Sequence, residues 1–256
     1  METVRDKARA LRERYWEKKV HLRGIIEFSN HCRQNCLYCG LRRDNQRLDR
    51  YRLDYKTIFA CAQDVAALGF GTVVLQSGED PALDVAGAAG FAALVERIKS
   101  ELGLAVTLSL GERKPREYAL LRKAGADRYL LKMEIMDAAL YASLRPGKKL
   151  EDRRSAFFRL QDLGYESGTG LIVGLPGDAE ASLEESLAEL ALWQPAMLSI
   201  SPFTPQSETP LRAAPGCGAN AALHAMALAR IHMPRAHIPV TSALNLHGEA
   251  VRRAGL

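Results

Sequence analysis

Three cysteines stand close together near the start of the chain, Cys32, Cys36 and Cys39, with the spacing C-x3-C-x2-C. Thiolates are soft ligands, and three of them on one loop can hold an iron–sulfur cluster or a zinc ion. An iron–sulfur cube usually takes four cysteines, so three would leave one iron open to a substrate or cofactor. Zinc would need a fourth ligand, which His31 or Cys61 could supply. The sequence holds no second cysteine pair of the kind that zinc knuckles use, so the spacing favours the cluster.

The other cysteines and the apolar pattern indicate where the protein works. The chain has five cysteines, an odd number, whereas disulfide frameworks of secreted proteins use even numbers. The charged segment 1–20 has no apolar core of a signal peptide, and no apolar run reaches the roughly 18 residues of a membrane span. We therefore expect reduced thiols in a cytoplasmic protein with no membrane partner.

Positive charge is concentrated near the amino terminus. The chain of 256 residues has a net charge of +5, yet residues 1–53 hold 14 Lys and Arg against 7 Asp and Glu. Such a cluster could follow a nucleic-acid backbone, but no aromatic or RNA-binding motif accompanies it. We therefore expect a basic helix and loop beside an anionic ligand, and no nucleic-acid partner.

Strands and helices alternate along the chain and must position these residues. The apolar runs expected as strands are 24–28, 72–77, 105–110, 128–133, 169–174 and 197–201, followed by an apolar run at 237–244. The segments expected as helices are 1–20, 54–69, 87–102, 115–124, 137–144, 150–163, 180–193 and 220–232. Continuous apolar strands indicate burial on both faces and parallel pairing with right-handed helical crossovers. The pattern predicts one α/β domain over 1–256, a TIM-like (β/α) barrel, complete or partial, with a doubly wound open sheet as the alternative.

Polar residues follow the ends of several expected strands. These are Gly78-Glu79-Asp80, Gly111-Glu112-Arg113, Glu134 and Gly174-Leu175-Pro176-Gly177. In parallel α/β barrels the active site lies at the carboxyl ends of the strands. We therefore expect these groups, together with the cysteines, to face one mouth.

The cysteine spacing, with Tyr38 before the last cysteine and a strand before the first, resembles the signature of the radical S-adenosylmethionine (SAM) superfamily. Gly78-Glu79-Asp80 resembles its motif for the methionyl amino group, and 170–174 resembles its glycine motif that packs on adenine. The resemblance implies that the three cysteines ligate a 4Fe-4S cluster and that SAM chelates the fourth iron. It also implies reductive cleavage of SAM to methionine and a 5′-deoxyadenosyl radical.

Longer stretches resemble a particular family, the HydE-type radical SAM maturase of FeFe-hydrogenase. They are GIIEFSNHCRQNCLYCGLRRDN, VLQSGEDP, TLSLGER, AGADRYLLKME, LYASLRPG, GLPGD and SPFTPQSETPL. This resemblance implies a small-molecule or iron–cysteine precursor of the H-cluster as substrate, with partner maturases and an electron donor. The alternatives are a methylornithine synthase-like or biotin synthase-like enzyme, or a non-catalytic metal- or SAM-binding barrel. Sulfur insertion of the biotin synthase type is disfavoured, because only Cys61 and Cys217 remain for a second cluster.

The resemblance also implies which residues bind SAM. Glu79 and Asp80 would hold the ammonium, and Arg153 would hold the carboxylate through its planar fork. Without the resemblance, the two acids would be a turn or helix cap, and Arg153 would pair with Glu151 or Asp152 on its own helix. The full cofactor set is Tyr38, Gly78, Glu79, Asp80, Ser109, Glu134, Arg153 and Gly174.

Substrate and catalytic roles are implied for five positions deeper in the barrel. They are Thr107, Arg128, Glu134, Thr241 and Ser242. Taken alone, Thr107 reads as an ordinary strand threonine and Arg128 as one half of a structural ion pair.

The sequence departs from the maturase pattern in three places. Residues 132–136 read Lys-Met-Glu-Ile-Met, where the family usually shows an Arg/Lys-His-Glu-Thr-Ala run. The run 174–177 lacks the acid that ends the superfamily's fifth-strand motif. The family's chain also extends several dozen residues further, so we expect the last strand of the barrel to be missing here.

Overall fold

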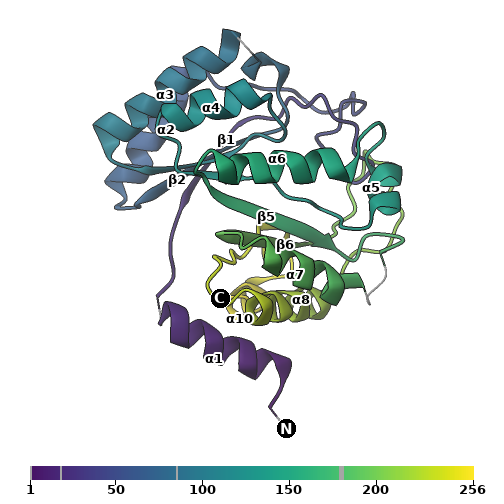
Figure 1. The fold of residues 1–256 in the computed structure, drawn as a ribbon. Helices are drawn as coiled ribbons and strands as arrows, with labels where there is room; N and C mark the ends of the chain where they lie inside the picture. The colour runs from purple at the N-terminus through teal and green to yellow at the C-terminus, as the bar shows by residue number, and fades with distance from the viewer. Residues whose placement is uncertain (1, 18, 85, 179–181) are drawn as a thin grey trace. The chain divides into compact units, whose positions relative to one another are not determined.

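Strands and helices alternate along most of the described chain (Figure 1). This computed structural model describes residues 2–17, 19–84, 86–178 and 182–256. The strands are β1 Gly24–Ser29, β2 Thr72–Ser77, β3 Ala105–Ser109, β4 Arg128–Leu130, β5 Glu166–Val173 and β6 Met197–Pro202. The longer helices are α1 Val4–Trp16, α2 Tyr55–Ala67, α3 Ala86–Leu102, α4 Pro115–Lys123, α6 Leu150–Asp162, α7 Ser182–Leu192 and α8 Ala219–His232. The shorter helices are η1 Pro81–Leu83, α5 Ala138–Leu144, α9 Ser242–Asn245 and α10 Glu249–Ala254.

The strands are hydrogen-bonded in the order β1-β2-β3-β4-β5-β6, which is their order in the sequence. The pairs β1/β2, β2/β3, β3/β4 and β5/β6 all run parallel. A helix follows nearly every strand, as right-handed crossovers between parallel neighbours require. The predicted parallel α/β arrangement is confirmed.

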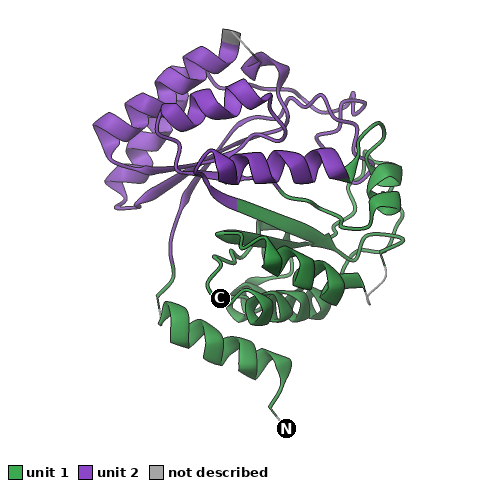
Figure 2. Ribbon diagram, viewed as in Figure 1, with its two compact units in different colours: residues 1–20, 132–150, 168–256 green, residues 21–131, 151–167 purple. Residues whose placement is uncertain are grey.

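The chain divides into two compact units, shown in separate colours in Figure 2. Unit 2 comprises residues 21–131 and 151–167, and it contains β1 to β4 with α2, α3, α4 and α6. Helices α2, α3 and α4 pack against one another in chain order. The fully buried side chains of Val73, Leu75, Val106 and Leu108 place its core at the centre of β2 and β3.

Unit 1 comprises residues 1–20, 132–150 and 168–256, and it contains most of β5, all of β6, and helices α1, α5 and α7 to α10. Helix α1 packs on α8, although some 200 residues separate them in the sequence. The Trp16 indole donates a hydrogen bond to the Pro234 carbonyl at 3.2 Å, and its ring centroid lies 4.3 Å from that of His237.

Local chemistry fixes the ends of the helices. A capping box begins α1, in which Thr3 and Asp6 exchange hydrogen bonds. At the other end Glu17 adopts a φ of 54°, so the helix stops at Trp16 rather than continuing over the predicted range 1–20. Asp54 caps α2 by accepting from the Thr57 amide at 2.7 Å. The predicted start of a helix at 180–181 lies outside the described residues.

Two expected strands differ from the sequence prediction. The run 237–244 forms one parallel bridge, His237 to Met197, and then enters α9. Pro239 lacks an N–H for a sheet ladder, which explains why this run does not continue as a strand. The predicted strand at 128–133 ends at Leu130, although Glu134 forms a further bridge to Leu171.

Strand β1 also corrects the expectation that every strand is buried on both faces. Ile26 and Phe28 are buried, but Ile25 is 58% exposed and Glu27 is exposed as well. The burial therefore alternates along β1, as it does in a strand with only one covered face. This strand stands at one end of the strand order, so it has a single neighbour, β2.

Candidate active site

The three cysteines lie on a loop of residues 30–51, here called the cysteine loop, which follows β1 in unit 2. All three cysteines are half-buried, and none of them forms a disulfide in the described part of the chain. The Gln34 amide donates to Cys32 Sγ at 3.4 Å, and the Cys39 amide donates to the Cys36 carbonyl at 3.2 Å. Burial raises the pKa of the Cys32 thiol, and the nearby Glu79 carboxylate adds to this effect.

Arg50 holds the cysteine loop together from inside. Its Nη1 donates to the carbonyls of Asn30 at 2.5 Å and Leu41 at 3.0 Å. Its Nη2 donates to the carbonyls of Arg42 at 2.7 Å and Asn45 at 3.3 Å. One guanidinium therefore binds four backbone carbonyls, and these lie on both sides of the three cysteines. A planar group with five donors in a rigid fork is suited to such a role.

Asp80 joins the two ends of the cysteine loop to the segment that follows β2. Ser29 and Arg52 form an antiparallel bridge at the base of the loop, and both bind Asp80. The Ser29 hydroxyl donates to Oδ2 at 2.6 Å, and Arg52 donates to both oxygens at 2.7 and 2.8 Å. The Ala82 amide donates to Oδ1 at 2.9 Å, so Asp80 also caps η1. Burial alone would raise the pKa of Asp80, but these hydrogen bonds lower it to about 2.

Gly78 lies where the cysteine loop crosses the end of β2. A Cβ atom at this position would come within 2.4 Å of the His31 carbonyl oxygen and 2.7 Å of Cys32 Cβ. The backbone therefore approaches so closely that only glycine fits. The short segment after β2 thus sets the position of the first cysteine.

Glu79, Glu112 and Arg153 form a buried charged cluster beside the cysteine loop. Arg153 Nη1 lies 2.9 Å from Glu112 Oε1 and 3.5 Å from Glu79 Oε1. Gln34, which stands between two of the cysteines, donates a hydrogen bond to the other Glu79 oxygen. Arg153 is thus directed at the ends of β2 and β3, whereas its neighbour Arg154 pairs with Glu151 on the helix.

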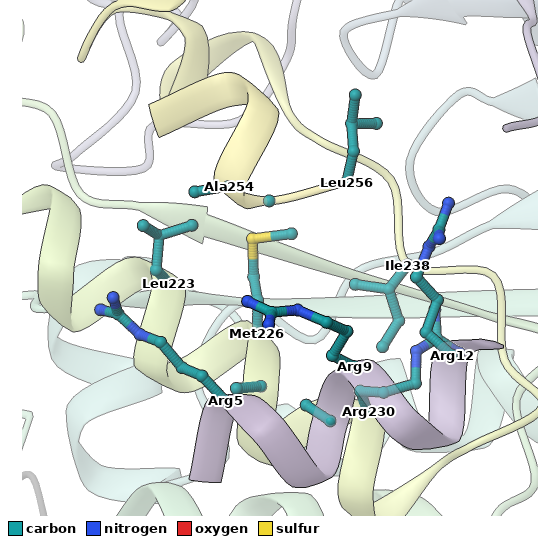
Figure 3. Close-up of a pocket in the computed structure, with 12 residues that line it drawn as sticks. Arg5, Arg9, Arg12, Leu223, Met226, Arg230, Ile238, Ala254 and Leu256 are labelled. Atoms are coloured by element: carbon teal, nitrogen blue, oxygen red, sulfur yellow. The ribbon is translucent and has the colours of Figure 1, made fainter. Parts of the chain in front are cut away.

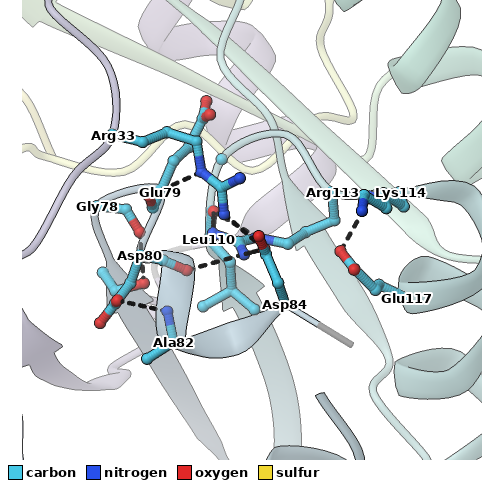
Figure 4. Close-up of polar contacts among 12 residues, drawn as sticks. Arg33, Gly78, Glu79, Asp80, Ala82, Asp84, Leu110, Arg113, Lys114 and Glu117 are labelled. Atoms are coloured by element: carbon cyan, nitrogen blue, oxygen red, sulfur yellow. Dashed lines mark hydrogen bonds and ion pairs between the residues drawn. The ribbon is translucent and has the colours of Figure 1, made fainter. Parts of the chain in front are cut away.

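A second buried arginine ties the same two strand ends together (Figure 4). Arg113 donates to the carbonyls of Leu110 and Asp80, and its Nη1 lies 3.0 Å from Asp84 Oδ1. Arg33, from the cysteine loop, reaches the same Asp84 oxygen at 2.5 Å. Through these contacts the cysteine loop and the segments after β2 and β3 form one hydrogen-bonded assembly within unit 2.

The other predicted residues of unit 2 are less closely connected to this assembly. Ser109 stands at the end of β3, and Tyr38 is half-buried in the cysteine loop. Thr107 is fully buried in β3, and its hydroxyl has no hydrogen-bond partner. Arg128 begins β4 and pairs with Glu166 at 2.5 Å, so it lies at the opposite end of the strand from the expected mouth. This placement supports the reading of Arg128 as half of a structural ion pair.

The remaining predicted residues belong to unit 1. Glu134 has a φ of 68°, its backbone bonds to Gly170 and Ile172, and its Oε2 lies 3.1 Å from Lys132 Nζ. A left-handed conformation at a residue other than glycine is uncommon and is often found at functional sites. Lys132 also donates to the Ser201 hydroxyl at 3.2 Å.

Gly174, Thr241 and Ser242 also lie in unit 1. Gly174 has a φ of 78°, and a Cβ atom there would come within 2.7 Å of Cys217 Cβ. The Thr241 hydroxyl caps α9 by accepting from the Leu244 amide, and Ser242 is exposed as the first residue of that helix. The assignment of these three residues to a cofactor or substrate stays a prediction.

The structure adds residues that the sequence analysis did not select. They are Ser29, Arg33, Arg50, Arg52, Asp84, Glu112 and Arg113. Glu112 and Arg113 were visible as a polar run after the third strand. Arg33, Arg50 and Arg52 were visible only as excess positive charge, since nothing in the sequence shows that Arg50 binds backbone carbonyls or that Arg33 and Arg52 pair with Asp84 and Asp80.

The donor set of unit 2 fits an iron–sulfur cluster with bound SAM. Three cysteines outside any disulfide supply soft ligands. The buried Glu79 carboxylate and the buried Arg153 guanidinium stand side by side, so they could bind the ammonium and the carboxylate of one ligand. In the part of the chain that the structure describes, no three His, Cys, Asp or Glu side chains are grouped closely enough to hold a single metal ion. The thiols of a cubane bind separate irons, so they need not converge on one point.

Comparison with known proteins identifies the family. Residues 26–190 match the radical SAM superfamily, and this match begins within β1 and covers the cysteine loop and the strands from β2 to β5. The chain belongs to the radical SAM superfamily, whose members use a 4Fe-4S cluster and SAM. The predictions of the family and of its cofactors are thereby confirmed.

Individual relatives narrow this assignment. The chain is 44% identical over 236 residues to the [FeFe] hydrogenase maturase subunit HydE of Thermotoga maritima, an alignment that covers 91% of this chain and 66% of the relative. It is 30% identical over 241 residues to the 3-methylornithine synthase of Methanosarcina acetivorans, covering 94% of this chain and 67% of the relative. The chain thus spans about two thirds of the length of these relatives.

A solved structure confirms the predicted architecture. The crystal structure of methylornithine synthase (PylB) superimposes with a TM-score of 0.88 at 28% identity, covering 98% of this chain and 74% of that chain. The parallel TIM-like arrangement predicted from the sequence is therefore confirmed. None of the helices in the described part of the chain is both long and apolar enough to cross a membrane.

Proposed function

We propose that this chain is the radical SAM core of a HydE-type maturase that acts in assembly of the FeFe-hydrogenase H-cluster. The observation that carries the proposal is the 44% identity to HydE over 91% of the chain, which includes the cysteine loop. The buried assembly of Glu79, Arg153 and Glu112 beside that loop supports it.

Cys32, Cys36 and Cys39 would hold the cluster, and Arg50 would keep their loop in one conformation through its four carbonyl contacts. When bound, the cluster and SAM supply reductive cleavage of the bond between sulfur and the 5′ carbon. Asp80 would act by positioning, because its two oxygens are engaged by Ser29, Arg52 and the Ala82 amide.

Glu79 and Arg153 would bind the two ends of the methionyl group. Their side chains are 6% and 7% exposed, so each would interact with a ligand in a medium that screens charge weakly. Tyr38, Gly78 and Ser109 would complete the SAM contacts of unit 2. Glu134 and Gly174, in unit 1, are the proposed contacts to the ribose and adenine.

Substrate binding is proposed for Thr107, Thr241 and Ser242, together with Glu134. The buried hydroxyl of Thr107 supports its part in this set, because a buried donor without a partner is costly unless a ligand satisfies it. The substrate would be a small molecule or an iron–cysteine precursor of the H-cluster, with partner maturases and an electron donor. A cluster with an open iron is sensitive to oxygen, so we place the protein in an anaerobic cytoplasm.

The experiment that tests the proposal is anaerobic reconstitution with iron and sulfide, followed by dithionite and SAM. We expect about four irons per chain and 5′-deoxyadenosine among the products. Cys36→Ala should abolish the deoxyadenosine, whereas Cys61→Ala, which removes a thiol from α2, should not. Bound zinc without a cluster would contradict the proposal. A cluster whose EPR signal responds to SAM, but without deoxyadenosine, would indicate a binding protein without turnover.

A methylornithine synthase-like reaction is the second candidate. It is favoured by the TM-score of 0.88 to that enzyme and by the unusual run Lys132-Met133-Glu134-Ile135-Met136. Complementation of a strain that lacks its own HydE would favour the maturase. Detection of 3-methylornithine in the same reaction mixtures would favour the second candidate.

A further inference from the structure

A cavity of about 230 Å³ lies in unit 1 among α1, α8 and α10 (Figure 3), and none of its lining residues takes part in the candidate active site. Four arginines line it, Arg5, Arg9 and Arg12 from α1 and Arg230 from α8. We call this cavity the arginine pocket. Because the three arginines of α1 are spaced by four and three residues, they lie on one face of the helix. Figure 3 shows this face toward α8.

The Arg230 guanidinium is held by backbone carbonyls, which do not neutralise its charge. Its Nη1 donates to the carbonyls of Pro234 at 3.0 Å and Ala236 at 2.7 Å. Burial, together with the charge of Arg12, lowers the pKa of Arg230 to about 10. Carbonyl oxygens fix the direction of a guanidinium but carry no formal negative charge.

The other arginines of the pocket have similar surroundings. Arg12 donates to the carbonyls of Glu17 and Lys19, and Arg5 donates to Asn220. Among the described residues, no carboxylate forms an ion pair with Arg5, Arg12 or Arg230. Arg9 has a weak partner in Asp6, at 3.8 Å and largely exposed. Several like charges around one cavity repel one another, and an anion in the cavity would relieve that repulsion.

We propose that the arginine pocket binds a small phosphate monoester. A phosphate group has three terminal oxygens and can accept hydrogen bonds from several guanidinium forks at once, which a carboxylate with two oxygens does less well. Leu223 and Met226 of α8 line the same cavity and provide an apolar surface for the organic part of the ligand. The volume of about 230 Å³ is below the range typical of drug-sized ligands, so the ligand is small.

Isothermal titration of the full chain with phenyl phosphate, inorganic phosphate and benzoate tests the proposal. Phenyl phosphate should bind tightest, because it combines the dianion with an apolar ring. Arg12→Gln should weaken this binding at least tenfold, and Arg230→Lys, which keeps the charge but removes the fork, should weaken it severalfold. Lys7→Gln is the matched control, since it removes one positive charge from α1 outside the pocket and should change the affinity less than twofold.

Three results would overturn the proposal. The first is no binding of phenyl phosphate at 10 mM, which would limit the binding free energy to about 2.7 kcal/mol. The second is an affinity for benzoate equal to that for phenyl phosphate. The third is an equal loss of phenyl phosphate affinity in Lys7→Gln and Arg12→Gln. Circular dichroism of each variant must match that of the parent chain. If Arg230→Lys does not fold, Arg12→Gln alone decides, because Arg12 is only half-buried and its substitution should leave the fold intact.

Discussion

Asp80 is fully buried, and each of its oxygens has hydrogen-bond donors from this chain. The sequence predicted it as a partner for the ammonium of SAM, or else as a turn or cap residue. The structure shows the capping contact and adds the bidentate pair with Arg52, which lies 28 residues away in the sequence. A pattern of residue types can indicate that a carboxylate is needed at a strand end, but it cannot show which donors fill its oxygens.

The lowered pKa of Asp80 gives a prediction about acid stability. The pKa of about 2 is below the ordinary value of 3.8, so the folded chain binds this proton more weakly than the unfolded chain does. The stabilisation is therefore complete above about pH 4, amounts to about 2 kcal/mol, and disappears as the pH falls toward 2. Asp80→Asn should lower the free energy of unfolding by about this amount at pH 7 and by much less at pH 2.5, as measured in urea.

Asp64→Asn is the control for this prediction, because Asp64 is an exposed carboxylate on α2. It should change stability by less than about 0.5 kcal/mol at either pH. A destabilisation in Asp80→Asn that is the same at both pH values would contradict the assigned role of the carboxylate charge.

The cysteine loop is an element without regular secondary structure, and its conformation is set by Arg50 and by the approach of Gly78. The sequence placed this loop correctly after the first strand, because cysteine spacing and strand composition are local signals. It could not show how the loop is held, since Arg50 binds carbonyls that every residue carries. The partners of Arg153 could not be predicted from the sequence either. Its neighbours in the sequence are Glu151 and Asp152. In the structure it pairs instead with Glu79 and Glu112, which follow β2 and β3.

Removal of the Arg50 guanidinium should loosen the cysteine loop. In Arg50→Gln four carbonyl contacts are lost or weakened, so we expect faster loss of the reconstituted cluster under a chelator, by about an order of magnitude if about 1.5 kcal/mol of loop stability is lost. The decay of cluster absorbance with time measures this. Arg43→Gln removes an exposed arginine of the same loop and should leave the decay rate unchanged. Equal decay in both variants would show that Arg50 does not position the loop.

Gly78 provides a second test of the same element. Alanine at this position would push against the His31 carbonyl and Cys32 Cβ, so Cys32 must shift. We expect Gly78→Ala to contain less than half of the iron of the parent chain after reconstitution. Gly71→Ala lies just before β2, where a Cβ meets no atom within 4 Å, and it should reconstitute normally. Full iron content in Gly78→Ala would mean that the crossing is not as tight as the structure shows.

At the scale of the whole molecule, the alternation of strands and helices was predictable because buried parallel strands are continuous apolar runs. The regions that were not predicted have specific causes. Pro239 ends pairing in the run 237–244. Beyond Leu130, among the described residues 131–136, only Glu134, which has a left-handed backbone, forms a further bridge, to Leu171. The packing of α1 on α8 could not be predicted from the sequence either, because a largely polar helix gives little indication of which element it packs against.

The contact between α1 and α8 should contribute to global stability. Trp16 donates to the Pro234 carbonyl and packs on His237, so Trp16→Ala removes both a hydrogen bond and a ring contact. Because Trp16 is only half-buried, we expect a loss of about 2 kcal/mol in the free energy of unfolding rather than the larger cost of a core aromatic. Urea denaturation measures this. Arg14→Ala, on the same helix, should cost less than about 0.5 kcal/mol. An equal loss in both variants would show that the contact of Trp16 with Pro234 and His237 is not the source of the stability.

The packing of α1 against α8 also determines when α1 can dock during synthesis on the ribosome. Helix α1 leaves the ribosome well before its partner α8, which is completed only at residue 232. At a synthesis rate of roughly 10 residues per second, α1 waits about 20 seconds before it can dock. Ala8 is the buried residue of this helix, and the remainder is largely charged, so the waiting segment presents little apolar surface on which nascent chains could aggregate. The polar composition of α1, which adds little to the core, thus suits a helix that must remain without its partner until α8 has been made.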